Sequence, residues 1–137
     1  MAEYPQLLHT VIDTTDVRAL AEFYRQLLGL RYRQGDEPPA DGVADDADWL
    51  VLVDVNGARR LAFQQVERLE RTTWPKHDIP MQMHLDCTVS SFEELQRQRE
   101  RAESLGAQLL LDRSDHADEP LYVLADLSGH PFCIFVG

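Results

Sequence analysis

The chain is poor in cysteine, in long apolar runs and in basic side chains, and each shortage excludes a class of protein. Two cysteines, Cys87 and Cys133, among 137 residues are too few for a small disulfide-stabilised scaffold. Both lie in apolar stretches, so we expect reduced thiols in a cytoplasmic protein. No apolar run approaches the roughly 20 residues that a membrane-spanning helix needs. Residues 1–5 have neither the basic nor the apolar region of a secretion signal, so we expect none.

Basic side chains number 13 against 24 acidic ones, which gives a formal net charge of −11. This balance argues against nucleic acid and anionic membranes as partners, because affinity for both comes largely from Lys and Arg. The sequence also lacks a glycine-rich phosphate loop, a nucleophile elbow and a paired-cysteine motif. The acidity favours a neutral or cationic small molecule as the partner. A hydrophobic fraction of 44% is enough for the core of one domain.

The charge is concentrated in one segment, residues 35–48, which read GDEPPADGVADDAD. It holds six acidic residues and no basic one, and so accounts for about half of the net charge. Its prolines and glycines and its lack of periodicity predict an exposed loop. The alternative is a lid that favours cationic ligands.

A pattern of one strand, one helix and three strands occurs twice along the chain. Short apolar runs predict strands at 7–12, 30–33, 49–55 and 61–66, and again at 82–89, 108–111, 121–125 and 132–136. Apolar stripes at helical spacing predict helices at 17–28 and 92–105, the first capped by Thr15 or Asp16 and the second by Ser91. The buried side of the second helix is predicted to be Phe92, Leu95, Ala102 and Leu105. Residues 67–80 are predicted to be a linker between the two copies.

Two histidines occupy the same place in the two copies. His9 and His84 each precede the following helix cap, at Asp16 or Ser91, by seven residues. Alternation along the strand at 82–89 places His84 and Asp86 on one face and the apolar residues on the face that packs on the helix. We therefore expect both histidines to face a cavity, although a structural role for each is the alternative.

Other side chains are less informative. His77, His116 and His130 lie in predicted loops and turns and are expected to be surface residues. The aromatic residues Trp49, Trp74 and Tyr122 fit the lining of a cavity or ordinary core packing equally well.

Three segments carry a resemblance to a known family: LAFQQV at 61–66, TTWPKHDIPMQMHLD at 72–86 and LADLSGHPFCIFV at 124–136. They resemble the vicinal oxygen chelate superfamily, which includes glyoxalase I, extradiol dioxygenases and bleomycin resistance proteins, and within it a glyoxalase-like subgroup of actinobacterial type. Leu127 stands where that subgroup usually has proline. The resemblance implies an α+β fold, in which two βαβββ modules, approximately residues 7–67 and 82–136 of a single domain, form a U-shaped mixed sheet around a ligand cavity, commonly in a homodimer.

The resemblance also implies a site for a divalent metal ion such as Zn, Fe, Mn or Ni. The family's ligand positions fall on His9, Gln64 (or Gln65 if the register slips by one), His84 and Cys133. The carboxylate that the metal-dependent relatives carry is replaced by Cys133, so the site is degenerate. Asp86, two residues beyond His84, makes these two a candidate acid–base pair.

Three functions follow from this set of residues. The first is a glyoxalase-like protein that binds a small molecule and acts as a lyase, isomerase or dioxygenase. The second is a metal-free protein of the bleomycin-resistance type that sequesters its ligand. The third is a structural or regulatory module with a vestigial cavity.

Overall fold

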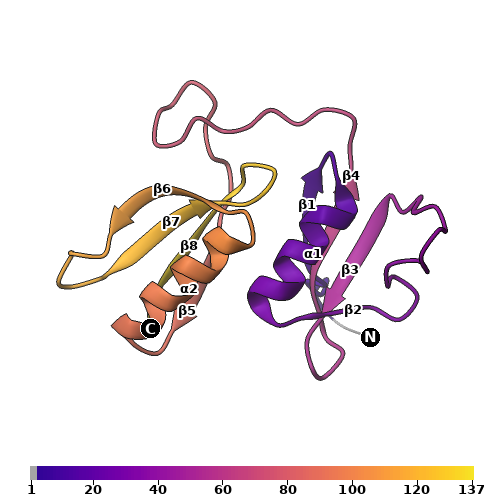
Figure 1. Ribbon diagram of the computed structural model, residues 1–137, viewed down its shortest axis with the longest axis horizontal. Helices are drawn as coiled ribbons and strands as arrows, with labels where there is room; N and C mark the ends of the chain where they lie inside the picture. The colour runs from indigo at the N-terminus through magenta and orange to yellow at the C-terminus, as the bar shows by residue number, and fades with distance from the viewer. Residues whose placement is uncertain (1–2) are drawn as a thin grey trace. The chain divides into compact units, whose positions relative to one another are not determined.

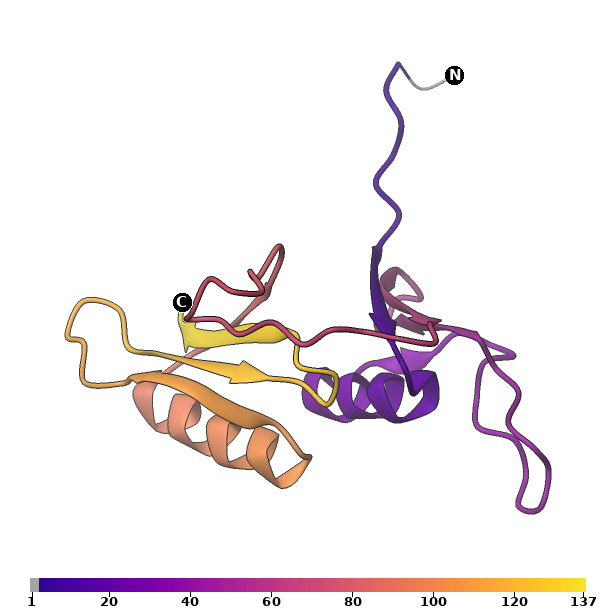
Figure 2. The same cartoon turned by 90° about the horizontal axis from the view of Figure 1, so that it is seen from above.

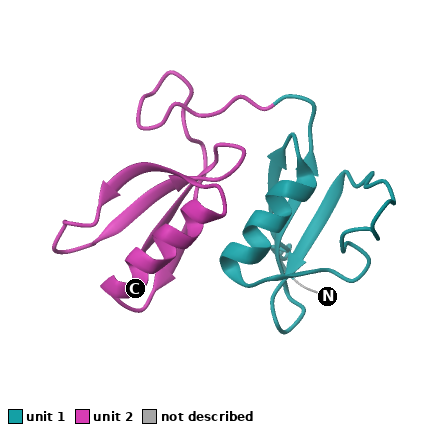
Figure 3. Cartoon of the chain, in the orientation of Figure 1, with its two compact units in different colours: residues 1–68 teal, residues 69–137 magenta. Residues whose placement is uncertain are grey.

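The computed structural model describes residues 3–137, and their contacts divide the chain into two compact units, residues 1–68 and 69–137 (Figure 3). Each unit contains one helix and four strands (Figure 1). The first unit contains β1 (Thr10–Thr14), α1 (Val17–Leu28), β2 (Arg31–Tyr32), β3 (Trp49–Val53) and β4 (Arg59–Gln65). The second contains β5 (Leu85–Val89), α2 (Phe92–Ser104), β6 (Gln108–Arg113), β7 (Leu121–Ala125) and β8 (Pro131–Val136).

The two units repeat the same sheet topology. The strand order is β1-β4-β3-β2 in the first four-stranded sheet and β5-β8-β7-β6 in the second. The pairs β1–β4 and β5–β8 are parallel and the others are antiparallel, so both sheets are mixed. Each helix lies along one face of its own sheet (Figure 2). The predicted α+β class with two βαβββ modules is confirmed, while their membership of a single domain stays a prediction.

Helix α1 begins and ends where the sequence predicted. The Asp16 carboxylate accepts a hydrogen bond from the backbone N–H of Ala19 at 3.2 Å, which satisfies one of the free donors at the helix start. Gly29 ends the helix with a φ of 66°, a left-handed conformation that glycine adopts without strain. Between them, the apolar stripe that includes Leu20 and Tyr24 is fully buried, and the Tyr24 ring stacks on Phe63 of β4.

Helix α2 packs through fewer residues than predicted. Ser91 caps it by accepting from the N–H of Glu94, and Leu95 and Ala102 are fully buried. The prediction that Phe92 is buried is wrong, because its exposed fraction is 44%. Phe92 is the first helical residue, and the residues that are buried in α2 begin one turn later, at Leu95.

Two strands begin later than predicted, and the shift places both histidines just outside a strand. The predicted strand at 7–12 is β1, which starts at Thr10, and the predicted strand at 82–89 is β5, which starts at Leu85. The reason is pairing: β1 meets β4 first at Thr10 and Leu61, and β5 meets β8 first at Leu85 and Phe132. His9 and His84 therefore each stand one residue before a strand.

The acidic segment 35–48 contains no helix or strand and is mostly exposed, as predicted. Two of its acidic residues nevertheless attach it to the unit. Arg18 of α1 donates to the Asp45 carboxylate at 2.6 Å and to the backbone carbonyl of Asp36 at 2.7 Å. The Asp36 carboxylate accepts from the backbone N–H of Val51 at 2.9 Å. The segment is therefore tied at both ends to α1 and β3.

The linker between β4 and β5 has no helix or strand, in agreement with the sequence. Neither α1 nor α2, the helices within residues 3–137, has the length and apolar character that crossing a membrane requires.

Candidate functional site

The face of the second sheet that α2 leaves uncovered carries a cluster of three polar side chains. In the register of β5 and β8, Asp86 lies directly opposite Cys133, and Cys87 lies opposite the buried Ile134. Because side chains alternate along a strand, Asp86 and Cys133 share the open face, while Cys87 and Ile134 point to the helix. This agrees with the assignment of faces made from the sequence.

His84 completes the cluster. Its Nε2 atom lies 3.2 Å from Oδ1 of Asp86, and both side chains are exposed. One ligand atom from each of His84, Asp86 and Cys133 lies within 4.8 Å of the other two. Within residues 3–137, this is the group of three or more His, Cys, Asp or Glu side chains with a spacing that could hold a metal ion.

The thiol of Cys133 is protonated at neutral pH in this arrangement. Burial, the charge of Asp86 and a hydrogen bond with Asp86 raise the pKa of Cys133 to about 11. The pKa of Cys87 is also about 11, again first because of burial and then because of Asp86. Neither cysteine is therefore a ready nucleophile, since the thiolate is the reactive form.

The three side chains fit a divalent metal ion, and their chemistry favours zinc. Imidazole nitrogen, carboxylate oxygen and thiolate sulfur are the three kinds of ligand that Zn²⁺ takes in proteins. A nearby cation removes the thiol proton, which offsets the raised pKa of Cys133. Three protein ligands leave a coordination position for a ligand, as catalytic zinc sites do.

The first unit holds the other predicted ligands, His9 and Gln64. Gln64 lies on the open face of its sheet, opposite Asp13 of β1 and Trp49 of β3. Gln65 points the other way: its Oε1 accepts from the backbone N–H of Val17 at 2.9 Å and its Nε2 donates to the carbonyl of Thr15 at 2.6 Å. Gln65 therefore holds the start of α1. The four-residue metal set of His9, Gln64, His84 and Cys133 stays a prediction.

Strand register identifies which residue of the first unit corresponds to Cys133. The pair Thr10–Leu61 begins one parallel ladder and the pair Leu85–Phe132 begins the other. Ala62 and Cys133 each follow the first paired residue of their strand, so Ala62 corresponds to Cys133. Gln64 lies two residues further along β4. Without this register, the sequences of the two copies do not show that Ala62, and not Gln64, corresponds to Cys133.

His9 lies in surroundings unlike those of His84. Its ring centroid is 6.1 Å from that of Trp49, and its Nδ1 atom is buried without a hydrogen-bond partner. Burial lowers the pKa of His9, and the positive charges of Arg59 and then Arg33 lower it further. The sequence analysis missed both arginines, and also missed Asp86 as a possible metal ligand. For Asp86, the signal was its position two residues from His84 on one strand face.

The remaining candidates are placed as follows. Tyr122 belongs to the core, with an exposed fraction of 2% and the guanidinium of Arg99 over its ring. Trp49 and Trp74 are half-buried. His77 and His116 are exposed, whereas His130 is half-buried, and its backbone N–H donates to the buried carboxylate of Asp126.

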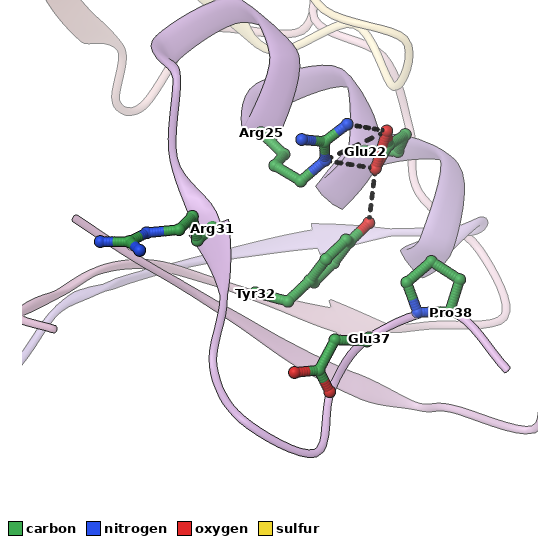
Figure 4. Close-up of a pocket in the computed structure, with 6 residues that line it drawn as sticks. All are labelled: Glu22, Arg25, Arg31, Tyr32, Glu37 and Pro38. Carbon is green, nitrogen blue, oxygen red and sulfur yellow. Dashed lines mark hydrogen bonds and ion pairs between the residues drawn. The ribbon is translucent and has the colours of Figure 1, made fainter. Parts of the chain in front are cut away.

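A surface depression of about 440 Å³ lies on the first unit (Figure 4). It is lined by Glu22, Arg25, Arg31, Tyr32, Glu37 and Pro38. Its polar groups are largely satisfied by one another, since Glu22 forms an ion pair with Arg25 at 2.6 Å and accepts from the Tyr32 hydroxyl at 3.1 Å. The depression contains neither of the predicted histidines.

Comparison with known proteins decides the family. The model of the glyoxalase-like domain matches residues 9–135, nearly the whole chain. The chain belongs to the glyoxalase-like domain family. This confirms the predicted membership of the vicinal oxygen chelate superfamily, while the actinobacterial subtype stays a prediction. No protein among those of curated function matches the sequence.

Solved structures of distant relatives share the fold. A glyoxalase/bleomycin resistance protein/dioxygenase family enzyme from Burkholderia phytofirmans is 18% identical, with a TM-score of 0.67 and coverage of 94% of this chain and 96% of that one. A variant of the fosfomycin resistance protein FosX from Listeria monocytogenes, complexed with Mn(II) and 1S,2S-dihydroxypropylphosphonic acid, is 16% identical, with a TM-score of 0.68 and coverage of 100% and 94%. A hypothetical protein from S. aureus is 16% identical, with a TM-score of 0.65 and coverage of 96% and 97%. At these identities, the similarity establishes the fold.

Proposed function

We propose that this glyoxalase-like protein binds a small metabolite next to a divalent metal ion held by His84, Asp86 and Cys133, and acts on it as a lyase, isomerase or dioxygenase. The observation that carries the proposal is the convergence of an imidazole, a carboxylate and a thiol within 4.8 Å on one sheet face.

The nature of the donors supports zinc as the metal. Carboxylate and water ligands suit Mn²⁺, whereas a thiolate favours a softer ion. The relative FosX is complexed with Mn(II), so metal binding by this fold has a precedent. The presence of a three-donor cluster argues against the metal-free alternative.

A bound metal would supply Lewis-acid polarisation of a substrate oxygen. The chain's own residues would hold and orient the reacting groups. Before an ion would bind, Asp86 lies within hydrogen-bonding distance of His84, so its carboxylate orients the imidazole ring. Burial and then Asp86 keep a proton on Cys133, because together they raise the pKa of that thiol to about 11.

We further propose a homodimer in the cytoplasm. Strands β1 and β5 are edge strands of their sheets. Within residues 3–137, each is paired with another strand along one of its two edges. An open strand edge is a template for pairing with another chain. The exposed Leu7 and Leu8, which precede β1, add apolar surface beside that edge.

Metal titration of chelator-treated protein tests the function. We expect the wild-type chain to gain one zinc ion per chain, and Asp86→Ala and Cys133→Ala to lose most of this affinity. Cys87→Ala is the matched control, because Cys87 belongs to the same strand as Asp86 but points to the helix face. Zinc binding that is equal in Cys133→Ala and Cys87→Ala, or no gain of zinc by the wild type, would contradict the proposal.

A further inference from the structure

The open face of the first sheet differs in character from that of the second. The pairs Val11–Ala62 and Val51–Ala62 place three small apolar residues side by side across β1, β4 and β3. Val51 and Ala62 are fully buried although they lie on the face that α1 does not cover. Alternation places His9 and Trp49 on the same face, and their ring centroids are 6.1 Å apart.

Two arginines border this apolar floor. Val53 lies on the same face as Val51, and Arg59 is its direct partner in β4, so the Arg59 side chain belongs to the open face. A bulge between Leu52 and Val53 displaces the next residue, Arg60, from the pairing. Arg33 follows β2 and donates its backbone N–H to the carbonyl of Val51.

The two arginines differ in how far their charges are neutralised. Arg33 forms an ion pair with Asp36 at 3.1 Å. Arg59 has no side-chain hydrogen bond or ion pair with any other residue in the part of the chain that the structure describes. Both guanidinium groups are close enough to His9 to disfavour its protonated form. Arg59 therefore supplies the uncompensated positive charge near His9, on a face that also carries the acidic Asp13.

The second observation is the unsatisfied imidazole. Buried polar atoms nearly always have a hydrogen-bond partner, and one that lacks it needs an explanation. Nδ1 of His9 is the buried side-chain nitrogen or oxygen without a partner within residues 3–137. A ligand that turns the His9 ring, or that brings a hydrogen-bond donor or acceptor next to it, would give Nδ1 the partner that it lacks.

We propose that this face binds a small planar organic carboxylate, whose anionic group is held by Arg59 and whose flat body lies against the rings of His9 and Trp49. A guanidinium matches a carboxylate in geometry and holds it by two parallel hydrogen bonds. The rings of His9 and Trp49 and the exposed side chain of Val11 suit a flat unsaturated body. The inference rests on the proposed function for small-molecule binding, but it involves no metal and no residue of the second unit.

Benzoate and benzamidine form a matched pair of probes, because both are small and flat but one is an anion and the other a cation. Each is titrated into chelator-treated full-length protein, and the resonances of the His9 imidazole and the Trp49 indole are followed by NMR. We expect saturable shifts of both resonances with benzoate and none with benzamidine. Arg59→Gln should weaken benzoate binding about tenfold or more, the usual effect of losing a hydrogen bond to a charged group.

Arg60→Gln is the matched control, because Arg60 neighbours Arg59 in sequence but its side chain is 62% exposed and lies near Asp54. We expect this variant to bind benzoate as the wild type does, and Arg59→Lys to retain part of the affinity. Equal benzoate affinity in Arg59→Gln and Arg60→Gln, a preference for benzamidine, or no saturable shift with benzoate would overturn the inference. Chelator-treated protein separates this result from the metal proposal, which zinc titration tests independently.

Discussion

The affinity of the proposed site for zinc should increase steeply with pH, because a protonated thiol must give up its proton before it can bind the metal. The pKa of Cys133 is about 11. At pH 7 the thiolate is therefore disfavoured by four pH units, which lowers the apparent affinity by about four factors of ten, or roughly 5 kcal/mol. Each unit of pH between 7 and 9 should recover one factor of ten, since histidine side chains are ordinarily neutral in that range.

Replacing the thiol by a carboxylate removes this penalty. In Cys133→Glu the ligand is already ionised at pH 7, so the apparent zinc affinity should be nearly independent of pH between 7 and 9. The same variant should bind Mn²⁺ better relative to Zn²⁺ than the wild type does, because a hard oxygen ligand replaces a soft sulfur ligand. Cys87→Ala keeps the thiol on the open face and should retain the full wild-type slope.

Calorimetric titration with zinc in two buffers of different ionisation heats counts the protons released. We expect about one proton per zinc for the wild type and Cys87→Ala at pH 7.5, and close to none for Cys133→Glu. Titration with Co²⁺, followed by the charge-transfer absorption of a metal–thiolate bond, provides an independent check. A wild-type affinity that does not change between pH 7 and 9, or proton release equal in all three proteins, would refute the reasoning.

Three further predictions concern stability and are checked by chemical denaturation. Gln65→Ala should lower the free energy of unfolding by about 1–2 kcal/mol, since it removes two hydrogen bonds that hold the start of α1, whereas Gln64→Ala should leave it nearly unchanged. Gly106→Ala should be more destabilising than Gly42→Ala by no more than about 1 kcal/mol: both glycines have positive φ, but a Cβ at 106 would lie 2.6 Å from a methyl carbon at the end of the flexible Leu127 side chain, which must turn aside, and one at 42 meets nothing within 4 Å. Burial raises the pKa of Cys87 from 9.0 to about 11, so the thiol of the unfolded chain ionises first as the pH rises. The contribution of Cys87 to the free energy of unfolding should therefore be complete below pH 9 and fall between pH 9 and 11. The fall should be smaller in Cys87→Ala, and an equal fall would contradict the assigned burial.

The helices were predictable from local signals, and the strand boundaries were not. The stripe and caps of α1 lie within one continuous segment, so spacing alone locates the helix between Asp16 and Gly29. The start of β1 depends instead on where β4, about 50 residues away, begins to pair with it. No local pattern distinguishes the apolar residues that precede Thr10 from those that pair. For the same reason, the strand register and the contact of Gln65 with α1 were needed to show that Gln64 lies on the open face and Gln65 does not.

The candidate site likewise combines residues that a local pattern could place with residues whose position depends on distant strands. Alternation along one strand was sufficient to place His84 and Asp86 on a common face, because it needs no distant partner. The resemblance to a known family grouped Cys133 with His84, but the position of Cys133 opposite Asp86 depends on the register between β5 and β8, which the structure supplies. The arginines around His9 have neither a motif nor a local period. They are brought together by the bulge in β3–β4 and by the chain that follows β2.

The register of the two parallel ladders explains why the repeat need not produce two equal sites. Where the second unit has the pair Asp86–Cys133, the first has the pair Val11–Ala62 at the equivalent step of the ladder. A valine and an alanine have no atom that can bind a metal, so a cluster like that of the second unit cannot form around His9 from the equivalent positions. Of these two residues, Ala62 is buried and Val11 is exposed. A repeat that keeps its histidine while exchanging a carboxylate and a thiol for methyl groups can therefore carry a metal-binding cluster in one unit and none at the equivalent position of the other.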